Sequence, residues 1–168
     1  NLYGKTKLDA ELMVNKNCQD ALIMRIPVLY GEPTPPARSP MLEDALKSAV
    51  SNDTSEHDNI IVRYPTLTDD VAEVILFFLE KNNAEGIIHV SAPEKATRYE
   101  WTLALTRLLG KDCGKIRIME SDPKRIAKRP VNSALNTDKL KSLGAPVPRG
   151  YNAVLPNLES VRDILNRR

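Results

Sequence analysis

Residues 1–32 read NLYGKTKLDAELMVNKNCQDALIMRIPVLYGE and place a helical pattern directly before a short apolar run. From Leu2 to about Lys16 most residues are good helix formers and proline is absent, so we expect a helix there. The apolar run 21–26 is ended by Pro27 and is typical of a strand that is covered on both faces of a parallel sheet. A helix that leads into such a strand favours the α/β class.

Helical and extended patterns alternate along the rest of the chain, which agrees with the α/β class. The sequence predicts further helices at 41–50, 68–79, 97–109, 137–143 and 158–165. It predicts strands at 60–62, 87–90 and 116–119, and loops in the proline-rich segment 32–40 and the polar segment 51–59. Thr97 and Glu100 have the spacing of a capping box, which indicates that a helix begins there.

Length and composition are those of an ordinary globular domain. The 168 residues suggest one domain, or the larger part of one cut from a longer protein, and the start at Asn1 without an initiator methionine indicates an internal start. Apolar residues make up 42% and charged residues 27%, values that argue against disorder, and no run of 18 apolar residues is present. We therefore expect a soluble protein without a membrane segment.

Cysteine and histidine give no sign of a metal site. Cys18 and Cys113 lie far apart in the sequence, which suits reduced thiols in a cytoplasmic protein better than a disulfide framework. Neither His57, in a polar run, nor His89, in an apolar run, has a second ligand at zinc spacing. We predict no metal, a cytoplasmic location, and a strand position at a sheet edge for a hydrogen-bonded His89.

Charge is nearly balanced overall but uneven along the chain. The net charge of +2 demands no polyanionic partner. Segment 107–149 nevertheless holds 11 Lys and Arg against 4 Asp and Glu, so it could face an anionic ligand, bind nucleic acid or form a solvated basic surface. Charge counting favours the solvated surface, and we predict no nucleic-acid partner.

Tyr3 and Lys7 form the pattern with the most defined chemistry. They are spaced i and i+4, so their side chains project from one face of the predicted helix. A phenol with a pKa near 10 is a poor acid or base at neutral pH, but an ammonium group held beside it favours the phenolate. The pair is therefore a candidate for proton transfer, although the pattern is weak by itself because both residue types are common.

Six short motifs follow one another along the chain, and their order is as informative as their residues. They are Asn1-Leu-Tyr-Gly-Lys-Thr-Lys-Leu-Asp-Ala-Glu11, Met24-Arg-Ile-Pro-Val-Leu-Tyr-Gly-Glu32, Tyr64-Pro-Thr66 with Asp69-Asp-Val-Ala72, Gly86-Ile-Ile-His-Val-Ser91, Lys128-Arg-Pro-Val-Asn-Ser-Ala-Leu135 and Asp138-Lys-Leu-Lys-Ser-Leu-Gly144. In this order the chain resembles the second half of the extended short-chain dehydrogenase/reductases, in the branch of dTDP-4-dehydrorhamnose reductase. Within that branch, the first two motifs and Tyr64-Pro-Thr66 look most like the regulatory β subunits of methionine adenosyltransferase.

The resemblance implies a fold and a division of the chain. It implies the C-terminal part of a Rossmann-like, doubly wound parallel sheet together with a small α/β substrate-binding lobe. Residues 1–32 would be the end of an NADP-binding Rossmann domain, with the active-site helix and the following strand. Residues 33–168 would be mainly the substrate-binding lobe, with some segments returning to the Rossmann sheet.

The resemblance also implies site residues. Tyr3 matches the catalytic tyrosine that protonates the substrate carbonyl, and Lys7 matches the lysine that tunes the phenol and hydrogen-bonds the nicotinamide ribose. The backbone that passes the nicotinamide matches Ile26, Pro27, Val28 and Leu29. Arg129 and Pro130 match a substrate-binding segment, where a guanidinium can pair with the pyrophosphate oxygens of a nucleotide-sugar; a loop arginine paired with a carboxylate is the alternative.

Two functions follow from the resemblance. The family's glycine-rich turn lies upstream of the tyrosine, and the glycines of this chain have no phosphate-loop spacing, so NADP would be bound mainly by an N-terminal half. The protein would then be a regulatory β subunit that binds the catalytic subunit of methionine adenosyltransferase, in S-adenosylmethionine biosynthesis. Alternatively it would be an active NADPH-dependent nucleotide-sugar 4-keto reductase with Tyr3 as general acid. In either case we expect residues 1–168 alone to be inactive.

Overall fold

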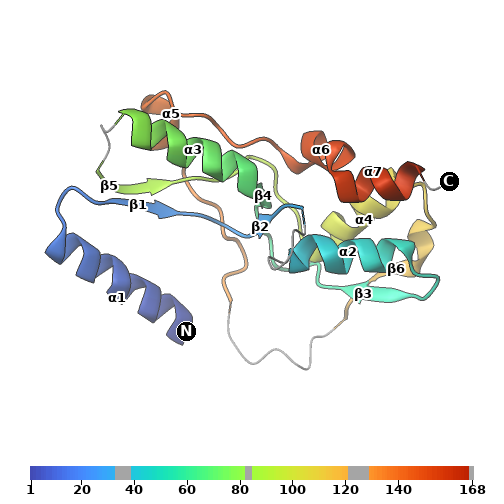
Figure 1. Cartoon of the computed structure of the whole chain (residues 1–168). Helices are drawn as coiled ribbons and strands as arrows, with labels where there is room; N and C mark the ends of the chain where they lie inside the picture. Colours follow the sequence, from blue (N-terminus) through green and yellow to red (C-terminus); the bar gives the residue numbers. More distant parts are fainter. Residues whose placement is uncertain (33–38, 82–84, 121–128, 167–168) are drawn as a thin grey trace.

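The computed structural model describes residues 1–32, 39–81, 85–120 and 129–166 (Figure 1). The α-helices are α1 (Leu2–Asn17), α2 (Pro40–Val50), α3 (Thr68–Lys81), α4 (Arg98–Leu108), α5 (Asp138–Ser142), α6 (Tyr151–Val154) and α7 (Glu159–Asn166). The strands are β1 (Leu22–Arg25), β2 (Leu29–Tyr30), β3 (Ser55–His57), β4 (Thr66–Leu67), β5 (Gly86–His89) and β6 (Ile116–Ile118). Two short 3₁₀ helices are η1 (Cys113–Lys115) and η2 (Leu155–Asn157).

The named strands pair in parallel. β1 pairs with β5, from Leu22 opposite Gly86 to Arg25 opposite His89. β2 pairs with β4, and β3 pairs with β6. Parallel strands need long crossover connections, and here these connections contain helices, so the predicted α/β class is confirmed.

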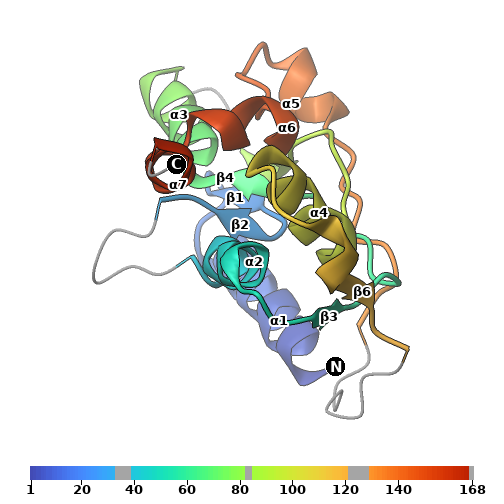
Figure 2. The ribbon, with the colours of Figure 1, turned by 90° about the vertical axis from the view of Figure 1, so that its right-hand side faces the viewer.

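The β1–β5 pair lies between two helices. Figures 1 and 2 show α3 on one side of the pair and α1 on the other. Three apolar residues of α3, Val71, Val74 and Phe78, are spaced three or four positions apart and form a buried stripe in the core that includes the strands. The resulting strand-side core consists of Val71, Val74, Phe78, Ile88, Val90, Leu140 and Ala145, with Leu22, Met24, Leu29, Phe77 and Leu143 packed against it.

A second core forms where α2, α4, α6 and α7 meet. This helix-side core consists of Tyr30, Leu42, Ala45, Ala49, Leu67, Ala96, Trp101, Leu105, Leu109, Tyr151, Val154, Leu155, Leu158 and Val161. Trp101 lies at its centre, with ring centroids 5.0 Å from Tyr30 and 5.2 Å from Tyr151, both in edge-on geometry. The Trp101 Nε1 donates to the Met41 carbonyl at 3.2 Å, so the indole is both buried and satisfied.

Helix α4 begins with the predicted capping box. The Thr97 hydroxyl accepts from the Glu100 N–H at 3.1 Å, and the Glu100 carboxylate accepts from the Thr97 N–H at 2.9 Å. The Thr97 hydroxyl also donates to Asn59 Oδ1 at 2.8 Å. The local pattern of the sequence was therefore enough to predict where this helix begins.

An ion pair joins the two cores. Asp70, near the start of α3, has a side chain that is only 4% exposed, whereas that of Arg149 is 59% exposed. Arg149 donates from Nη2 to Oδ1 of Asp70 at 2.6 Å, from Nε to Oδ1 at 3.0 Å, and from its backbone N–H to Oδ2 at 2.6 Å. This contact fixes the segment that enters α6 against α3.

The prediction of a surface loop over 51–59 was wrong in its centre. Residues 55–57 form β3, and His57 is 9% exposed. His57 Nε2 shares a hydrogen bond of 3.1 Å with Ser55 Oγ, and burial, with the nearby charge of Arg98, lowers the pKa of His57. Pairing with β6 and packing under α4 override the polar character of this segment.

Two further expectations need adjustment, and a third is not tested by the described residues. The predicted strand 60–62 is reduced, within the described residues, to single-residue bridges of Val62 with Asn132 and of Arg63 with Ala96. β1 is half-buried rather than fully covered, and α1 has no buried residue. The proline-rich loop lies outside the described residues over 33–38.

Candidate functional site

The predicted Tyr3–Lys7 pair lies in the first two turns of α1. Asn1 caps this helix by accepting from the Gly4 N–H at 2.9 Å. The Lys7 Nζ lies 5.7 Å from the centroid of the Tyr3 ring, and the Tyr3 residue is 71% exposed. The i, i+4 spacing thus brings a cation onto a phenol ring on an open helix face, as the sequence predicts.

The predicted cofactor-binding segment, Ile26–Leu29, connects β1 to β2. Ile26 is 42% exposed, and Pro27, Val28 and Leu29 are half-buried. The Val28 carbonyl accepts from the Thr66 N–H at 3.0 Å, which holds the segment against the start of β4. The segment therefore begins at the carboxyl ends of β1 and β5, the edge at which parallel α/β sheets bind ligands.

An ion pair joins α1 to β1. Arg25 Nε donates to Glu11 Oε1 at 2.8 Å, and Arg25 Nη2 donates to Glu11 Oε2 at 2.6 Å. The hydrogen bonds from Arg25 lower the pKa of Glu11, so the carboxylate stays charged at neutral pH. The sequence shows this pair only as an arginine inside an apolar strand, and the Glu11 partner cannot be predicted from the strand itself.

His89, the last residue of β5, lies opposite Arg25 in the strand register. Its Nδ1 shares a hydrogen bond of 3.0 Å with the Asn136 carbonyl. The sequence-based interpretation of His89 as a hydrogen-bonded strand residue at a sheet edge is confirmed.

Arg129 and Pro130 are both exposed. The segment that follows them is anchored on Val62, whose N–H donates to the Val131 carbonyl at 2.8 Å and whose carbonyl accepts from the Ser133 hydroxyl at 3.2 Å. Among the described residues, no hydrogen bond or ion pair joins Arg129 to α1. The structure therefore does not bring the two predicted parts of the site into direct contact.

Cations of the basic segment 107–149 make internal contacts. The Lys115 ammonium group donates to the carbonyls of Ala49, at 2.9 Å, and Ser51, and so caps the end of α2. The Lys139 ammonium group donates to the carbonyls of Glu85 and Ile87, at 3.1 Å each. Together with Arg149, these residues use their charge within the fold, which weakens the case for a nucleic-acid surface.

The part of the chain that the structure describes holds neither a metal-binding cluster nor a membrane-spanning helix. Among residues 1–32, 39–81, 85–120 and 129–166, no cluster of three His, Cys, Asp or Glu side chains is arranged to hold a metal ion. In the same ranges, no helix is both long enough and apolar enough to cross a bilayer.

The exposed α1 face and the adjoining segment offer groups that suit the nicotinamide end of NADP. The Tyr3 hydroxyl and Lys7 ammonium groups are donors for ribose hydroxyls, and Ile26–Leu29 supplies peptide groups.

Comparison of the sequence with known proteins gives consistent results. The family described as "RmlD substrate binding domain" matches residues 1–162. The chain is 36% identical over 148 residues to methionine adenosyltransferase 2 subunit beta of Rattus norvegicus, covering 86% of this chain and 44% of that protein. It is 28% identical over 164 residues to a probable dTDP-4,6-dihydroxy-2-methyloxan-3-one 4-ketoreductase of Streptomyces antibioticus, covering 97% of this chain and 54% of that protein. The chain thus spans about half the length of the relatives it matches.

Solved structures show the same fold. The dTDP-4-dehydrorhamnose reductase of Yersinia enterocolitica superposes with a TM-score of 0.82 at 20% identity, covering 96% of this chain and 56% of that chain. The dTDP-4-dehydrorhamnose reductase of Bacillus anthracis, in complex with NADP, superposes with a TM-score of 0.75 at 18% identity, covering 94% of this chain and 54% of that chain. At these identities the likeness concerns the fold, and it agrees with the Rossmann-like architecture expected from the sequence.

Proposed function

Because this chain belongs to the RmlD substrate-binding domain family, we propose that it is the C-terminal part of an NADP-binding regulatory β subunit of methionine adenosyltransferase. The observation that carries the proposal is the 36% identity to the rat β subunit, against 28% to the 4-ketoreductase. In this role the whole protein binds the catalytic subunit and acts in S-adenosylmethionine biosynthesis.

The proposal includes a division of the chain. Residues 1–32 form the end of the NADP-binding domain, and residues 33–168 form mainly the substrate-binding lobe. The strand-side core supports the return of later segments to the first domain, because β5 pairs with β1, α5 contacts β5, and residues of α3 share the core with Leu22 and Met24 of β1. The helix-side core, built from α2, α4, α6 and α7, would be the centre of the lobe.

Specific residues would contact NADP and a nucleotide-sugar. Tyr3 and Lys7 would hydrogen-bond the nicotinamide ribose, and the backbone of Ile26–Leu29 would lie along the nicotinamide. Arg129, beside Pro130, would pair with a pyrophosphate, a role supported by its exposed position.

The regulatory role is tested with the full-length protein and a methionine adenosyltransferase catalytic subunit. We expect the two to co-elute in size-exclusion chromatography and the kinetics of the catalytic subunit to change. A Tyr3→Phe variant should do both as well as the wild type, because removing one hydroxyl leaves the docking surface intact. Absence of both co-elution and a kinetic change would contradict the regulatory role.

The second candidate is an active nucleotide-sugar 4-keto reductase, favoured by the contact of Lys7 with the Tyr3 ring. NADPH would supply the hydride for such a reaction. Tyr3 would donate its phenolic proton to the carbonyl oxygen, and Lys7 would stabilise the phenolate left behind. With dTDP-4-keto-6-deoxy sugar as substrate, a Tyr3→Phe variant should lose about 99% of the rate of NADPH oxidation or more. An unchanged rate in that variant would rule out Tyr3 as the acid.

A further inference from the structure

Helix α1 carries the proposed cofactor-binding pair, yet packing does little to hold it within this chain. None of its residues is buried, and apolar side chains such as Leu8, Leu12 and Met13 are exposed. An isolated helix of this length is only marginally stable in water. The direction in which Tyr3 and Lys7 point therefore depends on the bonds that tie α1 to its neighbours.

The two-point contact of Glu11 with Arg25 is such a bond. Two parallel hydrogen bonds between a guanidinium and a carboxylate fix the orientation as well as the distance of the two groups. A single charge contact would leave the helix free to rotate. This contact therefore fixes the rotation of α1 relative to β1.

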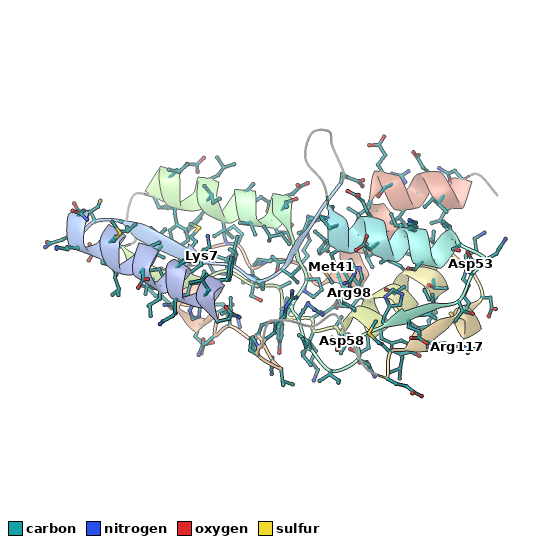
Figure 3. All side chains as sticks on the ribbon, turned by 90° about the horizontal axis from the view of Figure 1, so that it is seen from below. Lys7, Met41, Asp53, Asp58, Arg98 and Arg117 are labelled. Atoms are coloured by element: carbon teal, nitrogen blue, oxygen red, sulfur yellow. The ribbon has the colours of Figure 1, made fainter. Side chains whose placement is uncertain are left out.

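Glu11 lies on the same face of α1 as the proposed pair. Tyr3, Lys7 and Glu11 are spaced by four residues each, so they form one row along the helix. Figure 1 shows α1 running in the opposite direction to β1, with its C-terminal end nearer the strand than its N-terminal end, and Figure 3 labels Lys7 on α1. A contact that turns Glu11 toward Arg25 also turns Lys7 and Tyr3 toward the segment that continues from β1.

The spacing along the two elements agrees. On a helix, Lys7 lies about 6 Å and Tyr3 about 12 Å from Glu11 along the axis. On an extended chain, Pro27 lies about 7 Å and Leu29 about 13 Å beyond Arg25. Measured from the ion pair, the length of helix up to Lys7 matches the length of chain up to Pro27, and the length up to Tyr3 matches that up to Leu29.

We propose that Glu11 and Arg25 are positioning residues, whose ion pair fixes α1 so that Tyr3 and Lys7 face segment 26–29. Neither residue contacts the cofactor; each acts through the orientation of the helix. His89 lies opposite Arg25 in the strand register, and its Nδ1 shares a hydrogen bond with the Asn136 carbonyl. The inference rests on the proposed binding of NADP at this segment.

The test uses the full-length protein and two measurements. Hydrogen exchange of the α1 amides reports whether the ion pair holds the helix, and titration with NADPH reports whether the cofactor site depends on it. The variants are Glu11→Gln and Arg25→Gln, with Asp9→Asn as the matched control, because Asp9 is an exposed carboxylate of the same helix.

In the Glu11→Gln and Arg25→Gln variants, we expect α1 amides to exchange about fivefold faster and the dissociation constant of NADPH to rise about fivefold, which corresponds to a well-formed surface ion pair. Amides of α4 should be unchanged, and Asp9→Asn should behave as the wild type. The double variant Glu11→Arg with Arg25→Glu should recover a large part of both losses, since it restores the pair with its charges exchanged.

Unchanged exchange of α1 in both single variants would overturn the inference. Equal losses in the single variants and the double variant would also overturn it, because the effect would then belong to each residue and not to the pair. A wild-type protein that does not bind NADPH would instead contradict the proposed function, and hydrogen exchange would still decide whether the pair holds α1.

Discussion

The two partners of the Asp70–Arg149 ion pair differ in their access to water. The Asp70 carboxylate is enclosed between α3 and the segment before α6, whereas the guanidinium of Arg149 is largely exposed. The hydrogen bonds with Asp70 raise the pKa of Arg149, so the guanidinium keeps its charge. The buried Asp70 carboxylate needs Arg149 to compensate its charge, whereas water can solvate the Arg149 guanidinium without Asp70.

This asymmetry predicts unequal costs of substitution. Arg149→Met leaves a buried carboxylate with only its backbone donor, so we expect the free energy of unfolding to fall by about 3 kcal/mol. Asp70→Asn leaves a guanidinium that water can solvate, and we expect a loss of about 1 kcal/mol. Urea unfolding of the two variants checks the order, and equal losses would contradict it.

His57 predicts a pH dependence of stability. Its pKa is lowered in the folded protein, first by burial and then by the charge of Arg98, with Asp44 acting in the opposite direction. At a pH below about 6.5, the ordinary pKa of histidine, His57 therefore binds a proton more readily in the unfolded chain than in the folded protein. The contribution of His57 to stability is complete above that pH and declines as the pH falls toward the lowered pKa of the folded state.

The measurement is the free energy of unfolding from pH 7.5 to pH 5.5, in the wild type and in a His57→Gln variant. The carboxylates titrate alike in both proteins, so the difference in slope isolates His57. We expect the wild type to lose more stability than the variant over this range. Parallel curves would mean that His57 binds protons equally in both states.

At the scale of single elements, the ends of helices differ in how they are capped. The Thr97 side chain at the start of α4 makes a reciprocal cap with Glu100. Thr137, at the start of α5, makes no side-chain cap hydrogen bond. A threonine therefore precedes both helices, but only the Thr97 side chain caps its helix.

Replacing each threonine by alanine uses this contrast. Thr97→Ala removes the cap and the bond to Asn59, so we expect a loss of about 1 to 2 kcal/mol in the free energy of unfolding. Thr137→Ala should cost about 0.5 kcal/mol or less, since it removes no cap bond. Thermal or urea unfolding measures both, and a larger cost at Thr137 would refute the assignment of the caps.

At the scale of single elements, the sequence predicts structure that depends on residues close together in the chain, and it misses structure that depends on distant residues. The start of α4 and the Tyr3–Lys7 contact depend on residues three or four positions apart, and both were predicted correctly. β3 was missed because a polar strand is decided by its partner, β6, which lies about sixty residues further along the chain. The contact of Glu11 with Arg25 was missed for a similar reason, since it depends on how the turn after α1 directs the chain.

Across the whole molecule, the helices differ in how they are covered. Figure 2 shows α2 and α4 close together, and both contribute to the helix-side core. Helices α1 and α3 instead carry exposed apolar side chains, namely Leu8, Leu12, Met13, Ile75, Leu76 and Leu79. Apolar surface of this kind is typical of a region that another part of a protein covers.

We therefore expect residues 1–168, produced alone, to associate beyond the 18.8 kDa monomer. Light scattering over a range of concentrations measures the mass. The double variant Leu12→Lys with Leu79→Lys should shift the mass toward the monomer, whereas Val147→Lys, at an exposed valine elsewhere, should not. If the wild-type chain is monomeric at every concentration, the exposed apolar side chains do not drive association and the prediction is wrong.

The parallel pairing of β1 with β5 also has a consequence for synthesis. The paired residues Leu22 and Gly86 are separated by 64 positions. At about 5 to 20 residues per second, a ribosome needs roughly 3 to 13 s to make that stretch. During this interval β1 has been synthesised and its partner strand β5 has not. A chaperone that binds apolar segments therefore has a defined period in which it can shield β1.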